Sequence, residues 1–403
     1  MRLITQIQTW VFLLLFLSAT SGAAVQVVPK GYQKQDEASD SDLTLSQQAF
    51  ERHFAQAVKE YRQTLKSRRW PDAEISGPNR AIFYSEDFSE KRAVDFKANE
   101  IQVTLPTLRK GKVLDYQAMK KALEDTLLGL LSMSLQQAIA QDPVNRRLEQ
   151  LGGIRYASDL GAMGQDLILA ELFRDERPSL QAIQAMAAKL TKKAYIRYPA
   201  VASIGTLSFA FNDRTTYIVP LPERRALIKA KRYKPFIYEY ANEFNLPPSL
   251  IFAVVHAESH FNPLARSQTP AFGLMQIVPH TAGRDASTLL FNRKRLLSPA
   301  YLYNPKRNVQ VGTAYFHMLY YRYLKGIEDP QARMYCAIAA YNAGSLNVMK
   351  ALTGLGSINR AVPAINRLSR NEVLKRLLRR MPSLETREYL NKVLNLQKTY
   401  AQL

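Results

Sequence analysis

Between residues 43 and 222, hydrophobic positions alternate between helical and strand-like spacing. Six apolar side chains near the start recur three or four positions apart, which predicts one face of a helix: Phe50, Phe54, Ala57, Val58, Tyr61 and Leu65. Residues 93–105 alternate around the run KANE, which predicts a β-hairpin. Helical stretches are expected at about 115–141 and 178–193, and a β-rich region at 195–222 with NDRT as a turn. These features predict an α+β N-terminal domain.

Beyond residue 222 the hydrophobic pattern is helical throughout. Helices are predicted at 235–244, 249–260, 306–325, 330–342 and 384–402, and glycines follow two of them. No strand is needed there. Pro220, Pro222 and a basic run after them mark a domain boundary near 222, so we expect an all-α domain at 223–403 after the α+β domain at 43–222.

The N-terminal sequence is typical of a secretory signal peptide. Residues 1–24 combine an early arginine, a short apolar run and small residues at the end, and a polar linker is expected at 25–42. The segment is short for a membrane span, although an uncleaved anchor stays open as an alternative. Cys336 is the single cysteine, which excludes an intrachain disulfide, and we expect it to pack in the core.

Positive charge is concentrated in the second half of the chain. Residues 225–403 carry 26 Lys and Arg against 9 Asp and Glu, whereas residues 25–224 carry 28 against 25. A polyanionic partner is therefore expected, and export favours a cell-wall polymer or an anionic membrane surface over nucleic acid. A merely solvated basic surface is the alternative.

The run HAESHFNP at 256–263 raises the question of a zinc site. His256 and His260 have the spacing of a helical metal motif, but the acid stands two positions after the first histidine instead of one. Each residue turns a helix by about 100°, so Glu258 would point away from a metal held by both histidines. Ordinary histidines, with no metal, are the favoured interpretation.

Glu258 itself is a candidate general acid. Ile251, Val254 and Val255 precede it at helical spacing, so the carboxyl group ends an apolar stripe in the last turn of a predicted helix. Poor solvation and the negative helix end both raise the pKa of a carboxyl group, as a general acid near neutral pH requires. The alternative is an acid that simply reaches water at a helix end.

Four short blocks follow one another in the helical half: ESHFNP from Glu258, AFGLMQIVPHTA from Ala271, AYNAG from Ala340 and ETREY from Glu385. In their order and spacing, residues 230–403 resemble the lytic transglycosylases of the soluble-lytic-transglycosylase type, which implies a lysozyme-like helical fold. With the N-terminal unit added, the chain is most similar to the membrane-bound murein transglycosylases of type C. That group's name implies a lipid anchor on a cysteine, yet residues 15–30 contain none. We therefore expect an exported, periplasmic protein that is soluble or peripherally attached to the envelope membrane.

The resemblance assigns roles position by position. Glu258, Ser259 and Tyr389 match catalytic positions of the family. The positions matched to sugar binding are Ser267, Gly273, Leu274, Met275, Gln276, Tyr341 and Asn342. The expected partners are peptidoglycan strands, with an anionic membrane surface or other cell-wall enzymes as further options, and neither a cofactor nor a metal is expected.

The acids after Glu258 are few. They are Asp285, Glu328, Asp329, Glu372, Glu385 and Glu388. Because ordinary glycosidases use two carboxylates, the absence of an obvious partner favours a single acid/base. The family resemblance implies non-hydrolytic cleavage of the β-1,4 bond between N-acetylmuramic acid and N-acetylglucosamine, which gives 1,6-anhydromuramyl ends. A hydrolytic muramidase, or a noncatalytic peptidoglycan-binding factor, is the alternative, and Glu385 or Asp285 could still approach Glu258 in the fold.

Overall fold

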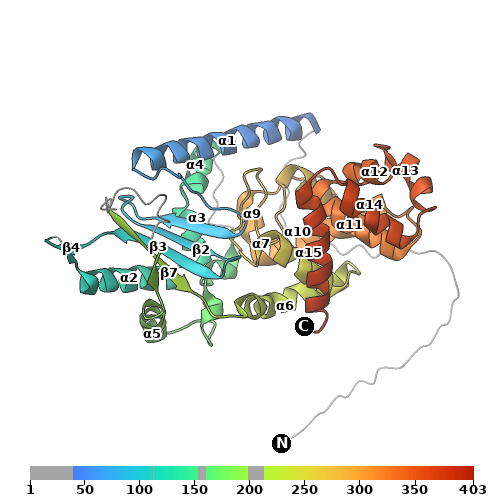
Figure 1. The fold of residues 1–403 in the computed structure, drawn as a ribbon. Coiled ribbons are helices and arrows are strands. Elements are labelled where there is room, and N and C mark those ends of the chain that lie inside the picture. Colours follow the sequence, from blue (N-terminus) through green and yellow to red (C-terminus); the bar gives the residue numbers. More distant parts are fainter. Residues whose placement is uncertain (1–39, 112, 153–159, 198–212) are drawn as a thin grey trace, which may run out of the picture. The chain divides into compact units, whose positions relative to one another are not determined.

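The computed structural model describes residues 40–111, 113–152, 160–197 and 213–403. The described residues form one compact unit (Figure 1). The predicted signal segment lies outside the described residues, as does most of the predicted linker. The domain boundary near 222 stays a prediction. Within the described ranges, every helix is too short or too polar to cross a membrane.

The N-terminal part contains an antiparallel sheet in the strand order β1-β2-β3-β7-β6. Its strands are β1 (Arg80–Tyr84), β2 (Lys91–Asp95), β3 (Glu100–Pro106), β6 (Tyr195–Ile196) and β7 (Arg214–Pro220), and a separate ribbon joins β4 (Arg109–Lys110) to β5 (Val113–Leu114). The predicted hairpin is confirmed, with Asp95 opposite Glu100. The turn predicted at NDRT is partly wrong, because Arg214 and Thr215 already belong to strand β7, where they pair with Pro106 and Leu105 of β3. Residues 198–212, which include the start of this run, lie outside the described ranges.

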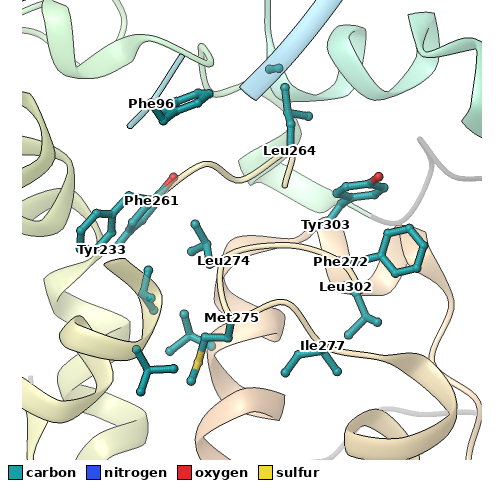
Figure 2. Packing of buried hydrophobic residues seen from close by; sticks show 14 of the residues in the cluster. Phe96, Tyr233, Phe261, Leu264, Phe272, Leu274, Met275, Ile277, Leu302 and Tyr303 are labelled. Carbon is teal, nitrogen blue, oxygen red and sulfur yellow. The ribbon is translucent and has the colours of Figure 1, made fainter. Parts of the chain in front are cut away.

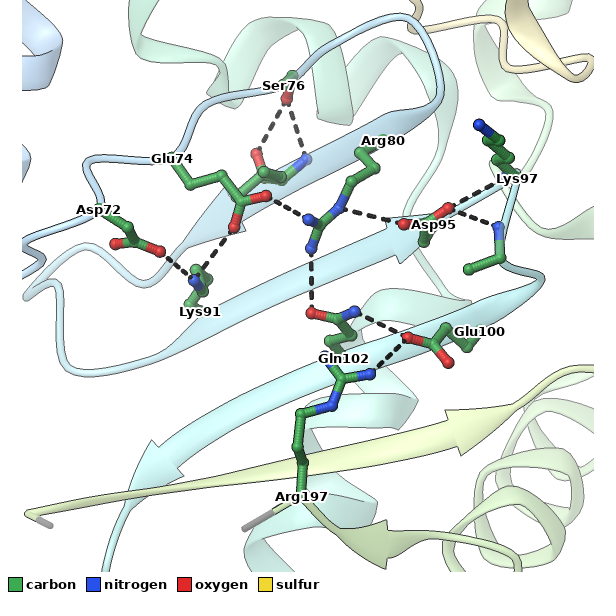
Figure 3. A network of polar contacts seen from close by, with 12 residues as sticks. Asp72, Glu74, Ser76, Arg80, Lys91, Asp95, Lys97, Glu100, Gln102 and Arg197 are labelled. Atoms are coloured by element: carbon green, nitrogen blue, oxygen red, sulfur yellow. Dashed lines mark hydrogen bonds and ion pairs between the residues drawn. The ribbon is translucent and has the colours of Figure 1, made fainter. Parts of the chain in front are cut away.

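The two faces of this sheet differ in chemistry. On one face, charged and polar side chains of β1, β2 and β3 neutralise one another (Figure 3). Arg80 reaches Gln102 at 3.0 Å and Asp95 at 3.4 Å, and Lys91 pairs with Asp72 at 3.0 Å. The other face carries Ala81, Val94, Ile101 and Val103, which are buried, and α2 and α5 pack on that side of the sheet.

Helices complete the N-terminal part: α1 (Asp40–Ser67), α2 (Tyr116–Leu131), α3 (Leu135–Gln141), α4 (Pro143–Gly152), the short η2 (Gly161–Gln165) and η3 (Ala170–Leu172), and α5 (Leu180–Thr191). The predictions for α1 and α5 are confirmed. The single stretch predicted at 115–141 is wrong in its middle, because Ser134 starts a new helix. Its hydroxyl accepts from the Gln137 backbone N–H, and the Gln137 side chain accepts from the Ser134 backbone.

Residues 225–403 are all described, and they form helices without a strand. The helices are α6 (Arg225–Glu243), α7 (Pro248–Ser259), η4 (Pro279–Gly283), α8 (Arg284–Phe291), α9 (Pro299–Tyr303), α10 (Pro305–His317), η5 (Met318–Tyr323), α11 (Pro330–Ala343), α12 (Ser345–Thr353), α13 (Ile358–Ile365), α14 (Arg370–Arg380) and α15 (Leu384–Tyr400). The all-α prediction is confirmed. The predicted start of α6 at 235 is ten residues late, because burial of Ala230 and Tyr233 extends the helix in front of Pro235.

One hydrophobic core runs through the unit. Phe272 is fully buried, and its ring centroid lies 5.5 Å from that of Tyr303 of α9 (Figure 2). The ring centroid of Phe54 of α1 lies 6.0 Å from that of Phe272. Cys336 is also fully buried, as predicted. Because α1 contributes to the core around the 271–277 loop, the N-terminal part helps to hold the segment that carries several predicted site residues.

Candidate active site

Helix α7 places Glu258 at the end of a buried apolar face. Proline at the first helical position favours the helix start at Pro248. Ile251, Val254 and Val255 are fully buried, as the spacing predicts, while Glu258 is partly exposed in the last turn. The helix ends at His260, whose φ of 50° is left-handed. Packing of the apolar face therefore fixes the direction of the Glu258 side chain.

Burial raises the pKa of the Glu258 carboxyl group to about 7. The Tyr389 hydroxyl group and the positive charge of Lys392 act in the opposite direction, and the charge of Glu385 raises the pKa further. A carboxyl group with this pKa populates both its protonated and its ionised form near neutral pH. It can therefore both donate and accept a proton there.

The two flanking histidines are engaged by neighbouring side chains. Nδ1 of His256 lies 2.8 Å from the Tyr400 hydroxyl oxygen, and Nδ1 of His260 lies 2.8 Å from Oδ1 of Asn79. Burial lowers the pKa of His256 to about 4 and that of His260 to about 3, so both rings are neutral at pH 7. Among the described residues, no group of three His, Cys, Asp or Glu side chains could hold a metal ion. These contacts account for both histidines as structural residues.

Ser259 connects α7 to the loop that follows. Its side chain is fully buried, and its hydroxyl group lies 2.8 Å from the Leu274 carbonyl oxygen and 3.1 Å from that of Val255. The hydroxyl group is therefore committed to backbone, and Ser259 holds the loop against the helix that bears Glu258.

Gly273 and Gln276 shape this loop. Gly273 has a φ of 76°, and a Cβ atom at this position would lie 2.3 Å from both Nδ2 of Asn308 and the Leu302 carbonyl oxygen, so only glycine fits. Asn308 accepts a hydrogen bond from the Met275 backbone N–H at 2.7 Å. Gln276 also has a positive φ, 48°, and its side-chain amide donates to the Gly273 carbonyl oxygen at 3.0 Å. Its Oε1 is buried and accepts no hydrogen bond from the described residues.

Three other residues of the predicted sugar-binding set have different surroundings. The side chains of Leu274 and Met275 are fully buried in the core (Figure 2), so either residue could meet a ligand only through its backbone. Ser267 closes a turn, because its backbone N–H and its hydroxyl oxygen both bond to Ala271, and its hydroxyl group donates to Thr269. Nothing in the structure links Ser267 directly to Glu258.

Helix α11 presents Tyr341 and Asn342. The Tyr341 hydroxyl group donates to the Met275 carbonyl oxygen at 2.9 Å, and burial together with the charge of Glu258 raises the pKa of Tyr341 well above its usual value. Asn342 accepts from the Thr386 hydroxyl group at 2.7 Å, which ties α11 to α15. Both residues thus lie at the junction between the loop and the two helices.

Helix α15 packs along α7 and brings two residues to Glu258. Tyr389 is buried next to the carboxyl group. Its hydroxyl group has no partner of normal hydrogen-bond geometry within the described ranges, but it lies close enough to Glu258 to lower the pKa of that carboxyl group. Lys392, three residues later on the same face, donates to the Ala257 carbonyl oxygen at 2.9 Å. Burial lowers the pKa of Lys392, and the charge of Glu258 opposes this change in part. Lys392 was not among the predicted site residues, although its spacing from Tyr389 could have indicated it.

The structure thus brings Glu258, Tyr389, Tyr341, Asn342 and the 273–276 loop into one neighbourhood. Asp285, one of the two acids considered as partners, accepts instead from the Tyr323 hydroxyl group at 3.0 Å. Glu385, the other, influences the pKa of Glu258 from the first turn of α15, with an exposed side chain. The site therefore has one carboxyl group whose pKa is raised by burial and one exposed carboxylate that acts on it through its charge.

Comparison with known families identifies the part of the chain that holds this arrangement. Residues 235–360 match the family model described as "Transglycosylase SLT domain". This part of the chain is similar to a transglycosylase SLT domain. The matched range contains Glu258, the 273–276 loop, Tyr341 and Asn342, whereas Tyr389 and Lys392 lie beyond it.

Similar proteins are known in several bacteria. The chain is 40% identical over 172 residues to a membrane-bound lytic murein transglycosylase C of Pectobacterium atrosepticum, covering 43% of this chain and 47% of that protein. It is 39% identical over 186 residues to one of Histophilus somni, covering 45% and 50%. A solved structure of an inactive mutant of the lytic transglycosylase Slt from Pseudomonas aeruginosa matches 42% of this chain and 24% of that chain, at 28% identity and a TM-score of 0.33. The chain spans about half the length of the curated relatives it matches.

Proposed function

We propose that this protein is a peptidoglycan lytic transglycosylase. It would cleave the β-1,4 bond between N-acetylmuramic acid and N-acetylglucosamine without consuming water and would leave 1,6-anhydromuramyl ends. The observation that carries the proposal is the position of Glu258, a carboxyl group with a pKa of about 7 at the end of a buried helix face within the range that matches an SLT domain. The helical part is proposed to have the lysozyme-like fold.

Glu258 supplies both proton transfers in the proposed reaction. The protonated carboxyl group donates its proton to the glycosidic oxygen as the bond from that oxygen to C1 of the muramyl residue breaks. The resulting carboxylate takes the proton of the muramyl C6 hydroxyl group, whose oxygen forms a new bond to C1. Glu258 therefore gives up one proton and takes one back, so the reaction requires neither a second carboxylate nor water.

The neighbours of Glu258 tune and complete the site. Tyr389 and Lys392 both lower the pKa of the carboxyl group and so support its ionised form after the first proton transfer. The unpaired Oε1 of Gln276 is available to accept a hydrogen bond from a sugar hydroxyl or amide group, as a buried acceptor requires. Asn342 and the ring of Tyr341 are proposed to contact the sugar, with Ser259 and Gly273 holding the loop.

A hydrolytic muramidase is the second candidate, and Glu385 is the residue that favours it, because a hydrolase would use another carboxylate to activate water. The exposed position of Glu385 supports the single-carboxylate mechanism instead. A noncatalytic binding factor is disfavoured by Glu258, because sugar binding alone does not require a carboxyl group whose pKa is raised by burial.

The proposed location is the periplasm, with soluble or peripheral attachment to the envelope. The excess of Lys and Arg after residue 225 supports binding to an anionic polymer or membrane surface. Raised ionic strength should then weaken binding to purified sacculi.

Mass spectrometry of muropeptides released from purified sacculi tests the proposed function. Anhydro ends, which are one water lighter than reducing ends, are expected with the protein and not with Glu258→Gln. Reducing ends would instead establish a hydrolase. Binding to sacculi without release of fragments by either protein would favour the binding factor.

A further inference from the structure

Strand β2 carries a cation on the hydrophobic face of the sheet. Arg92 alternates with the buried Val94 and lies opposite Phe83 on β1 and Val103 on β3. Its neighbour Lys91 points to the polar face, where Asp72 and Glu74 neutralise it (Figure 3). A strand that alternates in this way would normally place an apolar residue at position 92.

Among the described residues, no carboxylate is seen in an ion pair with Arg92, although Glu90 is close enough to act on its charge. Its Nε is buried and makes no hydrogen bond within the ranges that the structure describes. Burial lowers the pKa of Arg92, and the charge of Glu90 opposes that change only in part. A partly buried guanidinium group without a partner costs free energy, so its retention calls for an explanation.

The guanidinium group lines a cavity of about 620 Å³, which is within the usual range of ligand pockets. The cavity lies between edge strand β1, the end of α2, helix α3 and the start of α4. Tyr84 and Phe88 provide aromatic walls, Gln137 and Gln141 provide amides, and Arg146 adds a second cation. Two carboxylates also line the cavity: Asp142, which is paired with Arg266 at 2.9 Å, and Glu86, whose side chain is exposed.

Gly129 on α2 keeps this cavity open next to Arg92. A Cβ atom at Gly129 would have one neighbour within 4 Å, Nη1 of Arg92 at 3.9 Å. Glycine lowers the stability of a helix interior, and neither a positive φ nor a close approach requires it here. The absence of a side chain at this position leaves room beside the guanidinium group.

We propose that this cavity is a second binding site, separate from the Glu258 site, for a short peptide with a free carboxylate. The carboxylate pairs with Arg92, which supplies parallel donors that match its geometry. Peptide amides bond to the glutamine side chains at positions 137 and 141, and the aromatic walls cover the aliphatic parts.

The proposal deepens the proposed function and rests on it for the source of the peptide. Peptidoglycan strands carry short stem peptides with free carboxylates, so a site for such a peptide would hold the same polymer that the Glu258 site is proposed to cleave. The cavity would thereby give the N-terminal part a role in recognising the substrate.

Isothermal titration calorimetry with the purified full-length protein tests the site. The probe is the free tetrapeptide L-Ala-γ-D-Glu-L-Lys-D-Ala, and a second titration uses the same peptide with every carboxylate converted to an amide. Because neither peptide contains a glycosidic bond, binding is measured independently of glycan cleavage. Failure of this test would therefore leave the proposed function standing.

Variants of two residues locate the binding. Arg92→Met should weaken binding of the acidic peptide at least tenfold, and Gly129→Leu should do the same by filling the cavity without lowering Tm. Gly129→Ala, which adds a single methyl group, and Lys121→Met, which removes an exposed cation from α2, should both bind like the unmodified protein. Equal binding to Arg92→Met, equal binding of the amidated peptide, or no binding to the unmodified protein would each overturn the proposal.

Discussion

The Ser259 hydroxyl group lies 2.8 Å from the carbonyl oxygen of Leu274 and so joins the helix that bears Glu258 to the loop that bears Gln276. The Met275 backbone N–H also donates to Asn308 at 2.7 Å, and the Tyr341 hydroxyl group donates to the Met275 carbonyl oxygen at 2.9 Å. Of these contacts, the one made by Ser259 ties the loop directly to the helix that bears the proposed acid/base.

Removal of this contact should affect both stability and catalysis. In Ser259→Ala the buried Leu274 carbonyl group loses its partner, which should cost about 1–2 kcal/mol of unfolding free energy. Because the loop is then held less firmly, kcat should fall while the pH profile keeps its shape. Ser287→Ala is the matched control, since this buried hydroxyl group also bonds to backbone, at 2.7 Å, but lies in α8. It should lose stability with normal kcat, and equal losses of kcat in both variants would contradict a specific role for Ser259.

The raised pKa of Glu258 predicts how stability depends on pH. A carboxyl group with a pKa of about 7 in the folded state and about 4.5 in the unfolded state binds its proton more tightly when folded. Its contribution therefore destabilises the fold progressively as pH rises from about 4.5 to 7. Glu258→Gln should abolish this dependence and raise the unfolding free energy at pH 8 by roughly 1–3 kcal/mol, with little change at pH 4. Thermal unfolding at both pH values provides the measurement, and an equal shift at pH 4 and pH 8 would refute the raised pKa.

Glu385→Gln separates the two enzymatic candidates. Removal of this charge should lower the pKa of Glu258, because the negative charge of Glu385 helps to raise it. The alkaline limb of the pH–rate profile should then move to lower pH, with kcat at its optimum within about threefold of the unmodified value. A hydrolase that used Glu385 as its base would instead lose about two or more orders of magnitude. The rate of muropeptide release across pH 5–9 distinguishes the two outcomes.

Local signals in the sequence predict much of the fold. Proline and aspartate at the starts of helices, together with apolar spacing, place α7 and α11, and the alternation around KANE places the β2–β3 hairpin. Short helices such as α12, α13 and α14 were not predicted individually, because two or three turns contain too few periodic positions to be recognised. The break before α3 depends on reciprocal bonds around Ser134, which compete with continuation of the helix.

The candidate site is less predictable, because its electrostatics depend on residues far apart in the chain. Glu258 and its raised pKa follow from one helix, but Lys392 acts on it from a helix that starts more than a hundred residues later. Arg266 is nearly fully buried and pairs with Asp142 at 2.9 Å, a contact between the two halves of the chain that no local pattern indicates. The full exclusion of Met275 from solvent depends on Gly312, where a Cβ atom would lie 2.4 Å from the methionine sulfur.

Tyr389→Phe isolates the proposed contribution of the hydroxyl group next to Glu258. This hydroxyl group lowers the pKa of the carboxyl group, so its loss should move the alkaline limb of the pH–rate profile to higher pH. The second proton transfer passes through the carboxylate form, which then loses a stabilising donor, so kcat should fall about tenfold or more. Tm should change little, because the hydroxyl group makes no regular hydrogen bond to the residues described.

Tyr400→Phe serves as the control for this prediction, since Tyr400 lies on the same helix and its hydroxyl group pairs with Nδ1 of His256 at 2.8 Å. This variant removes a formed hydrogen bond and should lower the unfolding free energy by about 1 kcal/mol, while the pH at the alkaline limb stays where it was. The two tyrosines should thus give opposite patterns, a kinetic effect without a stability cost at 389 and a stability cost without a pH shift at 400. An unchanged rate and pH profile in Tyr389→Phe would remove Tyr389 from the catalytic site and leave Lys392 as the group that lowers the pKa of Glu258.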